Sequence, residues 1–85
     1  MLEILIKEYI SKLTEIDIKK YAKDYNINIT DDECKVLYLY AKNYWKDFYK
    51  GEPKELINEI KEKLNPATFN RLYKIYKDAK SKINK

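Results

Sequence analysis

The stretch from Asp31 to Lys50 runs for twenty residues without a glycine or a proline, and it restricts the fold of this 85-residue chain more than any other segment. Thr30 and Glu33 form a capping box at its start, in which each side chain bonds the other's backbone amide. Gly51 follows its end, where helices commonly stop. Apolar residues occupy nearly every side between residues 36 and 49, which is typical of a helix covered by several neighbours. We therefore expect a central helix over about residues 31–50.

The rest of the chain predicts further helices joined by short loops. Its only helix-breaking residues are Gly51, Pro53 and Pro66, whereas sheet proteins use many glycines and prolines in their turns. Apolar residues recur at helical spacing on both sides of the central stretch. We expect helices at about residues 2–13, 15–25, 31–50, 53–64 and 66–81. Together they predict one all-α domain over residues 1–85, a compact five-helix orthogonal bundle with short loops.

Each of the first two helices carries an apolar stripe that we expect to face inward, because a surface helix buries one face. In the first helix the stripe consists of Leu2, Leu5, Ile6, Tyr9, Ile10 and Leu13. In the second it consists of Ile18, Tyr21, Ala22 and Tyr25. Asn26 is the predicted stop of the second helix, since Asn tolerates left-handed backbone. Pro53 and Pro66 each suit the first position of a helix, and Asn65 is the expected cap of the last one.

Sequence motifs for chemistry are few, and we expect no enzyme, no metal site and no cofactor. The chain has no histidine, which is the commonest general base and metal ligand near neutral pH. Cys34 stands alone, and we interpret it as a small core residue. Asp31, Asp32 and Glu33 are explained by helix capping, because a calcium loop alternates its ligands around a glycine. No glycine-rich phosphate loop is present.

Positive charge is concentrated at the end of the chain. The net charge of +4 arises because residues 70–85 carry a net +5 and residues 1–69 a net −1. This predicts a candidate anion or nucleic-acid face, made of Arg71, Lys74, Lys77 and Lys80. The alternative is that these cations only interact with the negative end of the last helix dipole and keep the end of the chain in water. Abundant Lys, Asn, Ile and Tyr are also typical of an AT-rich coding genome.

Tyrosine is the other unusual component, with nine residues in a short chain. A small core cannot bury all of them, and partly exposed tyrosines suit protein interfaces because they offer contact area at low entropic cost. The candidate protein interface on the central helix consists of Tyr38, Tyr40, Tyr44 and Tyr49.

The expected location is the cytoplasm. A single cysteine excludes an internal disulfide, and small secreted domains usually contain several. Charged residues interrupt the apolar run at the N-terminus, so no signal segment is predicted. No stretch approaches the roughly 20 apolar residues that a membrane span requires.

Two segments resemble the YqfT-like uncharacterised family of short Bacillus-type proteins. The first carries the matching residues Tyr21, Ala22, Lys23, Tyr25, Ile27, Ile29 and Thr30. The second carries Asn65, Pro66, Ala67, Thr68, Asn70, Leu72 and Tyr73. The resemblance covers about residues 10–80. It implies a helical fold and a cytoplasmic, Firmicute-type origin, and it implies no activity, because that family has none assigned.

The sequence therefore favours a non-catalytic protein–protein interaction or structural module, whose partner is an unknown protein or a second copy. The alternative is a nucleic-acid-binding accessory protein that uses the basic C-terminal helix.

Overall fold

Five α-helices make up the computed structural model, which describes residues 2–83 and the side chains of residues 2–82. They are α1 (Leu2–Lys12), α2 (Glu15–Asp24), α3 (Asp31–Lys50), α4 (Lys54–Lys63) and α5 (Pro66–Ile83). The described residues contain no strand, so the all-α, five-helix prediction is confirmed.

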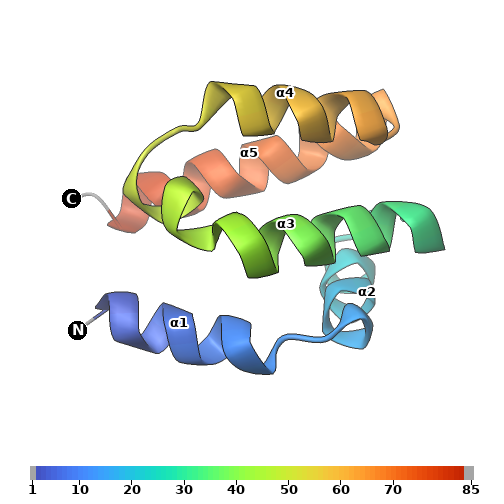
Figure 1. Ribbon diagram of the computed structural model, residues 1–85. Coiled ribbons are helices and arrows are strands. Elements are labelled where there is room, and N and C mark those ends of the chain that lie inside the picture. The colour runs from blue at the N-terminus through green and yellow to red at the C-terminus, as the bar shows by residue number, and fades with distance from the viewer. Residues whose placement is uncertain (1, 84–85) are drawn as a thin grey trace.

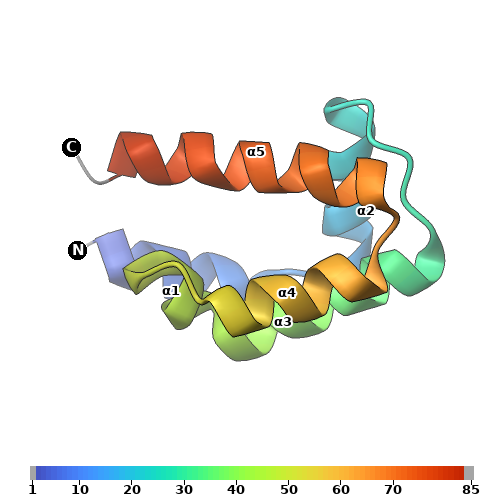
Figure 2. The same cartoon turned by 90° about the horizontal axis from the view of Figure 1, so that it is seen from above.

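Helix α3 lies at the centre of the arrangement, as predicted. It packs against α1, α2 and α4, and Figure 1 shows it between α1 on one side and α4 on the other. Helix α5 lies behind this layer, and Figure 2 shows α2 crossing at one end between α1 and the level of α5. Because α2 spans only one end, α1 and α5 approach each other without packing closely.

Local hydrogen bonds confirm the predicted helix starts. Thr30 accepts from the Glu33 amide at 3.1 Å, and Glu33 Oε1 accepts from the Thr30 amide at 3.0 Å. An equivalent capping box joins Thr14 and Asp17 at the start of α2. Asn65 Oδ1 accepts from the amide of Ala67 in the first turn of α5. These side chains satisfy amides that have no partner within the helix.

Asn26 is the residue that stops α2, as predicted. Its φ of 58° places it in the left-handed region, which Asn tolerates better than most residues. The turn lets the Ile27 amide donate to the carbonyl of Ala22 at 2.8 Å. Ile27 is buried as a result, and the segment after it crosses to the start of α3.

One predicted helix start differs from the structure: Pro53 precedes α4 as its N-cap and is not its first helical residue, because its ψ of 92° is extended and not helical. Helix α3 ends at Lys50 and Gly51 follows it, as predicted, with extended backbone at φ −154°. Helix α5 lies against this end of α3. The Tyr76 hydroxyl is within hydrogen-bond distance of the carbonyls of Phe48, at 2.8 Å, and Gly51, at 2.9 Å, and Lys80 also donates to the Gly51 carbonyl.

Glu33 joins the start of α3 to the turn before α5. Its side chain is almost fully buried, 7% exposed. One carboxylate oxygen accepts from Thr30, and the other accepts from the Asn65 amide at 2.8 Å. The bond from the Asn65 amide and, to a smaller extent, the bond from the Thr30 amide lower the pKa of the Glu33 carboxyl. A charged acceptor stabilises this junction more than a neutral one, because a hydrogen bond to an ionised group is stronger than one between neutral groups.

Several neighbours contact α3, as expected, but they cover it only in part. Among its described residues only Glu33 and Cys34 are buried, and Leu39 is 53% exposed. Helix α3 is also kinked at Tyr44, where φ is −129° and ψ is 17°. The buried apolar core of the described chain is correspondingly small: Leu13, Ala22, Ile27, Cys34, Leu64 and Phe69.

Replacing Glu33 tests the junction. We expect Glu33→Gln to lower the free energy of unfolding by about 2–3 kcal/mol, because a hydrogen bond to a charged group contributes about 1.5–3 kcal/mol and one amide loses its acceptor. Glu62→Gln, on the exposed side of α4, is the matched control and should change it by less than about 0.5 kcal/mol. Urea denaturation at one protein concentration measures both. Equal effects of the two substitutions would show that the Glu33 bonds do not stabilise the fold.

The lowered pKa of Glu33 also predicts a dependence of stability on pH. A carboxyl with a lower pKa in the folded state contributes its full stabilisation above the unfolded pKa of Glu, about 4.3. The contribution is lost as the pH falls through the lower folded value. Between pH 6 and pH 2 the wild type should therefore lose more stability than Glu33→Gln. Thermal unfolding followed by circular dichroism measures the difference, and parallel curves would contradict the prediction.

Candidate functional site

Five residues that the helical pattern places on inner faces are exposed in the structure. On α1 they are Leu2 at 43%, Leu5 at 63% and Tyr9 at 47%, and on α2 they are Tyr21 at 47% and Tyr25 at 54%. Only part of each predicted stripe is buried or half-buried, namely Ile6, Ile10 and Leu13 from the first and Ile18 and Ala22 from the second. The apolar stripes are thus wider than the surfaces that the fold offers to cover them.

An apolar hollow of about 110 Å³ lies beside these exposed residues. Helices α2, α3 and α5 and the segment after α2 contribute its walls. The side chains that line it are Ile18, Tyr21, Ala22, Tyr25, Ile27, Ile29, Leu37, Leu72 and Ile75. No charged side chain is among them. Such a hollow offers shape and apolar contact, the properties of a docking site for an apolar side chain.

The exposed stripe of α1 adjoins this hollow through a pair of tyrosines. The rings of Tyr9 and Tyr21 lie 6.4 Å apart, and the Tyr9 hydroxyl donates to that of Tyr21. Burial and, to a smaller extent, the bond to Tyr21 raise the pKa of Tyr9 to about 12. Residues 2, 5 and 9 share one side of α1. The stripe and the hollow therefore form one surface, the α1–α2–α5 groove, consisting of Leu2, Leu5, Tyr9 and the lining residues of the hollow.

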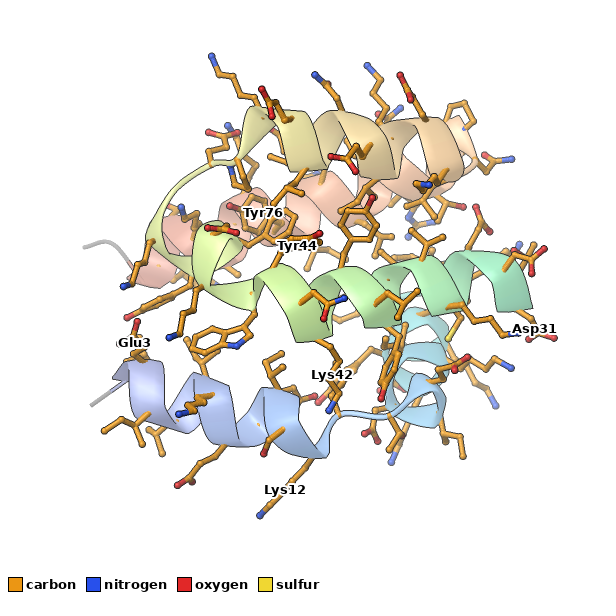
Figure 3. All side chains as sticks on the ribbon, viewed as in Figure 1. Glu3, Lys12, Asp31, Lys42, Tyr44 and Tyr76 are labelled. Carbon is orange, nitrogen blue, oxygen red and sulfur yellow. The ribbon has the colours of Figure 1, made fainter. Side chains whose placement is uncertain are left out.

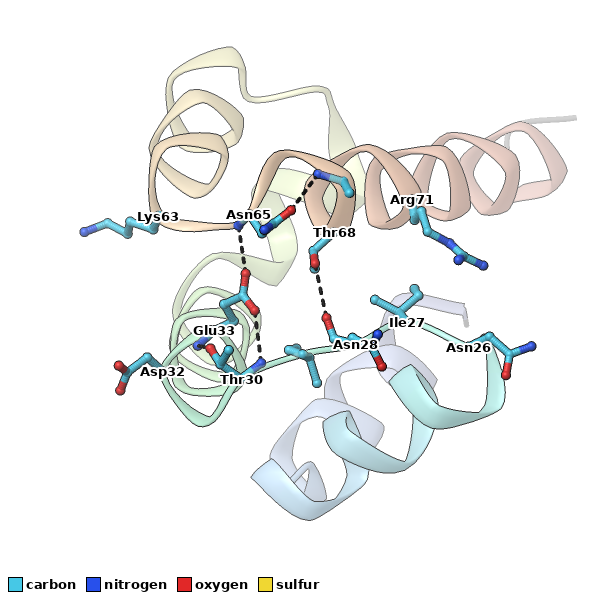
Figure 4. A pocket seen from close by; sticks show the side chains of 12 residues that line it. Asn26, Ile27, Asn28, Thr30, Asp32, Glu33, Lys63, Asn65, Thr68 and Arg71 are labelled. Atoms are coloured by element: carbon cyan, nitrogen blue, oxygen red, sulfur yellow. Dashed lines mark hydrogen bonds between the residues drawn. The ribbon is translucent and has the colours of Figure 1, made fainter.

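A second, polar hollow of about 670 Å³ lies at the start of α5 and shares Ile27 and Ile29 with the apolar one. Figure 4 shows hydrogen bonds across it: Glu33 accepts from the Asn65 amide, and the Thr68 hydroxyl donates to the carbonyl of Asn28 at 3.2 Å. Its two buried polar side chains, Glu33 and Thr68, therefore both have partners within the chain. These bonds fasten the segment after α2 to α5, so we assign this hollow a structural role.

The four tyrosines of the predicted protein interface do not gather on one patch. Tyr40 donates to Glu59 of α4 at 2.8 Å, and that bond, with burial, raises its pKa to about 12. Tyr44 lies beside Tyr40 with ring centres 5.5 Å apart, is 39% exposed and points toward α4 in Figure 3. Tyr38 is half-buried beneath the ammonium of Lys42, and Tyr49 is half-buried near the end of α3.

The four predicted cations of α5 are mostly bonded within the chain. Arg71 donates to the carbonyl of Tyr25 at 2.9 Å, Lys77 lies 3.3 Å from Glu52, and Lys80 donates to Gly51. Only Lys74 is exposed with no polar contact in the described part of the chain. Burial raises the pKa of the Cys34 thiol, and its sulfur donates to the carbonyl of Glu15 at 3.2 Å, consistent with a core residue.

Residues 2–83 bring together no group of three or more potential metal ligands from His, Cys, Asp and Glu. Within the same residues, none of the helices combines the length and the apolar character that a membrane crossing needs.

The local sequence pattern missed the α1–α2–α5 groove as a site. Helical spacing identified the five exposed residues of α1 and α2, but assigned all five to inner faces. The available signal was the width of the stripe: six apolar residues on a helix of three turns exceed what contact with one neighbouring helix can cover.

Comparison with known proteins gives a family and no activity. The model of a family described as Protein of unknown function (DUF2624) matches residues 1–79. No curated protein matches the chain, and no solved structure matches it either.

Proposed function

The chain belongs to the DUF2624 family, and we propose that this member is a non-catalytic protein-binding module whose binding site is the α1–α2–α5 groove. One observation carries the proposal: five residues with the pattern of core positions are exposed on α1 and α2, and two of them, Tyr21 and Tyr25, line an apolar hollow. Large contiguous apolar surfaces on small domains mark interaction sites, because leaving them in water is unfavourable.

The composition of the groove suits recognition of a protein. Tyrosine combines a large apolar ring with a hydroxyl that tolerates water. Two tyrosines line the hollow, Tyr21 and Tyr25, and Tyr9 bonds to Tyr21. The aliphatic residues Leu72 and Ile75 lie within it. An apolar centre with an amphipathic edge is the usual anatomy of a protein interface. An apolar face of a helix is the ligand that such a groove accommodates.

Two finer expectations accompany this proposal. We propose that the protein acts in the cytoplasm, which fits a single cysteine that is buried and unpaired. Its relation to the YqfT-like proteins of Firmicutes stays a prediction, as does nucleic-acid binding by Arg71, Lys74, Lys77 and Lys80.

Photo-crosslinking in cells of the source organism tests the proposed site. Tyr25→p-benzoylphenylalanine places a photoreactive ring at the edge of the groove with little change in shape. Irradiation should yield discrete protein adducts larger than the monomer. Lys61→p-benzoylphenylalanine, on the exposed side of α4, is the matched control and should yield none. The absence of adducts from position 25, or equal adducts from both positions, would overturn the proposed site.

A further inference from the structure

We infer that the partner protein presents an aliphatic side chain beside an acidic one, and that the apolar hollow binds the first while Arg71 binds the second. This inference rests on the proposed function and specifies the chemistry of its ligand. It follows from the position of Arg71 at the border of the hollow, from the size of the hollow, and from the open donors of the guanidinium.

Arg71 stands where the two hollows meet. The polar and the apolar hollow share Ile27 and Ile29 of the segment between α2 and α3. Arg71 lines the polar hollow and donates to the carbonyl of Tyr25, whose side chain lines the apolar one. The next residue of α5, Leu72, lines the apolar hollow. A ligand seated in the apolar hollow therefore has the Arg71 guanidinium next to it.

The apolar hollow has the size of one aliphatic side chain. Its volume is about 110 Å³, smaller than the roughly 150 Å³ of a cavity that binds benzene. Leu37, Leu72 and Ile75 are among its walls, and none of its lining side chains is charged. An aliphatic group that enters leaves water, and this burial supplies affinity. We therefore assign the hollow to a Val, Leu or Ile side chain of the partner.

Arg71 is the only arginine of the chain, and no acidic side chain of the described residues forms an ion pair with it. Each of the three ion pairs there uses a lysine: Lys19 with Asp31, Lys50 with Glu3, and Lys77 with Glu52. The bond to the Tyr25 carbonyl, at 2.9 Å, engages Nη2. A guanidinium has five N–H donors in a fork that matches a carboxylate. The bond to Tyr25 holds this fork in place and leaves other donors open for an acid.

The surroundings of Arg71 favour an anion. Figure 4 shows Asn26 on the same side of the polar hollow as Arg71. Asn26 is exposed, and its side-chain amide makes no hydrogen bond within residues 2–82. Asp32 and Lys63 lie on the opposite side of this hollow in the same view. Glu33, the other acid of the hollow, already accepts from two backbone amides. Neither acid therefore neutralises Arg71, and Asn26 offers a further N–H donor beside it.

An acidic segment of another protein fits both parts of this site. The net charge of +4 attracts such a segment, whereas a second copy brings the same positive excess. A nucleic acid supplies anions for Arg71 but no aliphatic group for the hollow. The experiment therefore includes DNA as a competitor.

Selection of random linear peptides displayed on phage, with the purified full chain as target, tests the inference. Peptides that bind the wild type should share an aliphatic residue and an Asp or Glu at a fixed spacing. Arg71→Glu should select Lys or Arg in place of the acid, because the charge at the border is reversed. Lys74→Glu is the matched control. It makes the same charge change about one turn along α5, at an exposed residue that lines neither hollow, and should keep the acidic preference. Circular dichroism checks that each variant folds.

Calorimetric titration with one selected peptide measures the contact itself. Arg71→Gln should raise the dissociation constant at least about tenfold, because a hydrogen bond between two charged groups is lost. Changing the acid of the peptide to its amide should weaken binding to the wild type by a similar factor, with little further effect on Arg71→Gln. Such non-additivity identifies two groups in direct contact. Single-stranded DNA of mixed sequence should not displace the peptide.

The outcomes distinguish the inference from the proposed function. The acidic ligand is overturned if no peptide is enriched, if the enriched peptides lack this pair of residues, or if Arg71→Glu keeps the acidic preference. Additive effects in the titrations, or displacement by DNA, also overturn it. Adducts at position 25 would then still support a protein in the groove, with a different chemistry. A selection without enriched peptides together with no adducts at position 25 overturns both.

Discussion

The buried carboxylate of Glu33 is the contact on which the rest of the structure depends. It bonds the Thr30 amide at the start of α3 and the Asn65 amide at the turn before α5, residues that are far apart in the sequence. At the other end of α3, Tyr76 and Lys80 of α5 bond its last carbonyls. Helix α5 is therefore fixed along α3 by polar bonds at both ends. At the same end as Tyr76 and Lys80, the ring of Phe48 packs edge-on against that of Tyr76, with ring centres 5.7 Å apart.

This arrangement leaves a groove open. Helix α2 crosses at one end of the molecule, and α1 packs on α3 at a distance from α5 (Figure 2). The chain then buries only six apolar side chains among its described residues, fewer than its composition, with 45% hydrophobic residues, can supply. Apolar surface is the main source of folding free energy in water. A small domain with such a core gains stability from any partner that binds its folded state.

The sequence predicted what short-range chemistry decides. The capping box at Thr30 and the left-handed stop at Asn26 depend on residues within a few positions of each other. It did not predict which part of a stripe is covered, because helical spacing defines a side and not the neighbour that lies against it. The start of α4 differed because Pro53 takes extended backbone before the helix and not helical backbone within it.

Hydrogen–deuterium exchange of the wild type and of Glu33→Gln tests the central claim most directly, because it reports which segments open when the bonds of Glu33 are weakened. The amides at the start of α3 and of α5, next to Glu33, should become less protected in Glu33→Gln, while those of α1 stay equally protected. An equal loss of protection in every helix, or no loss in any of them, would contradict the claim that Glu33 joins α5 to α3.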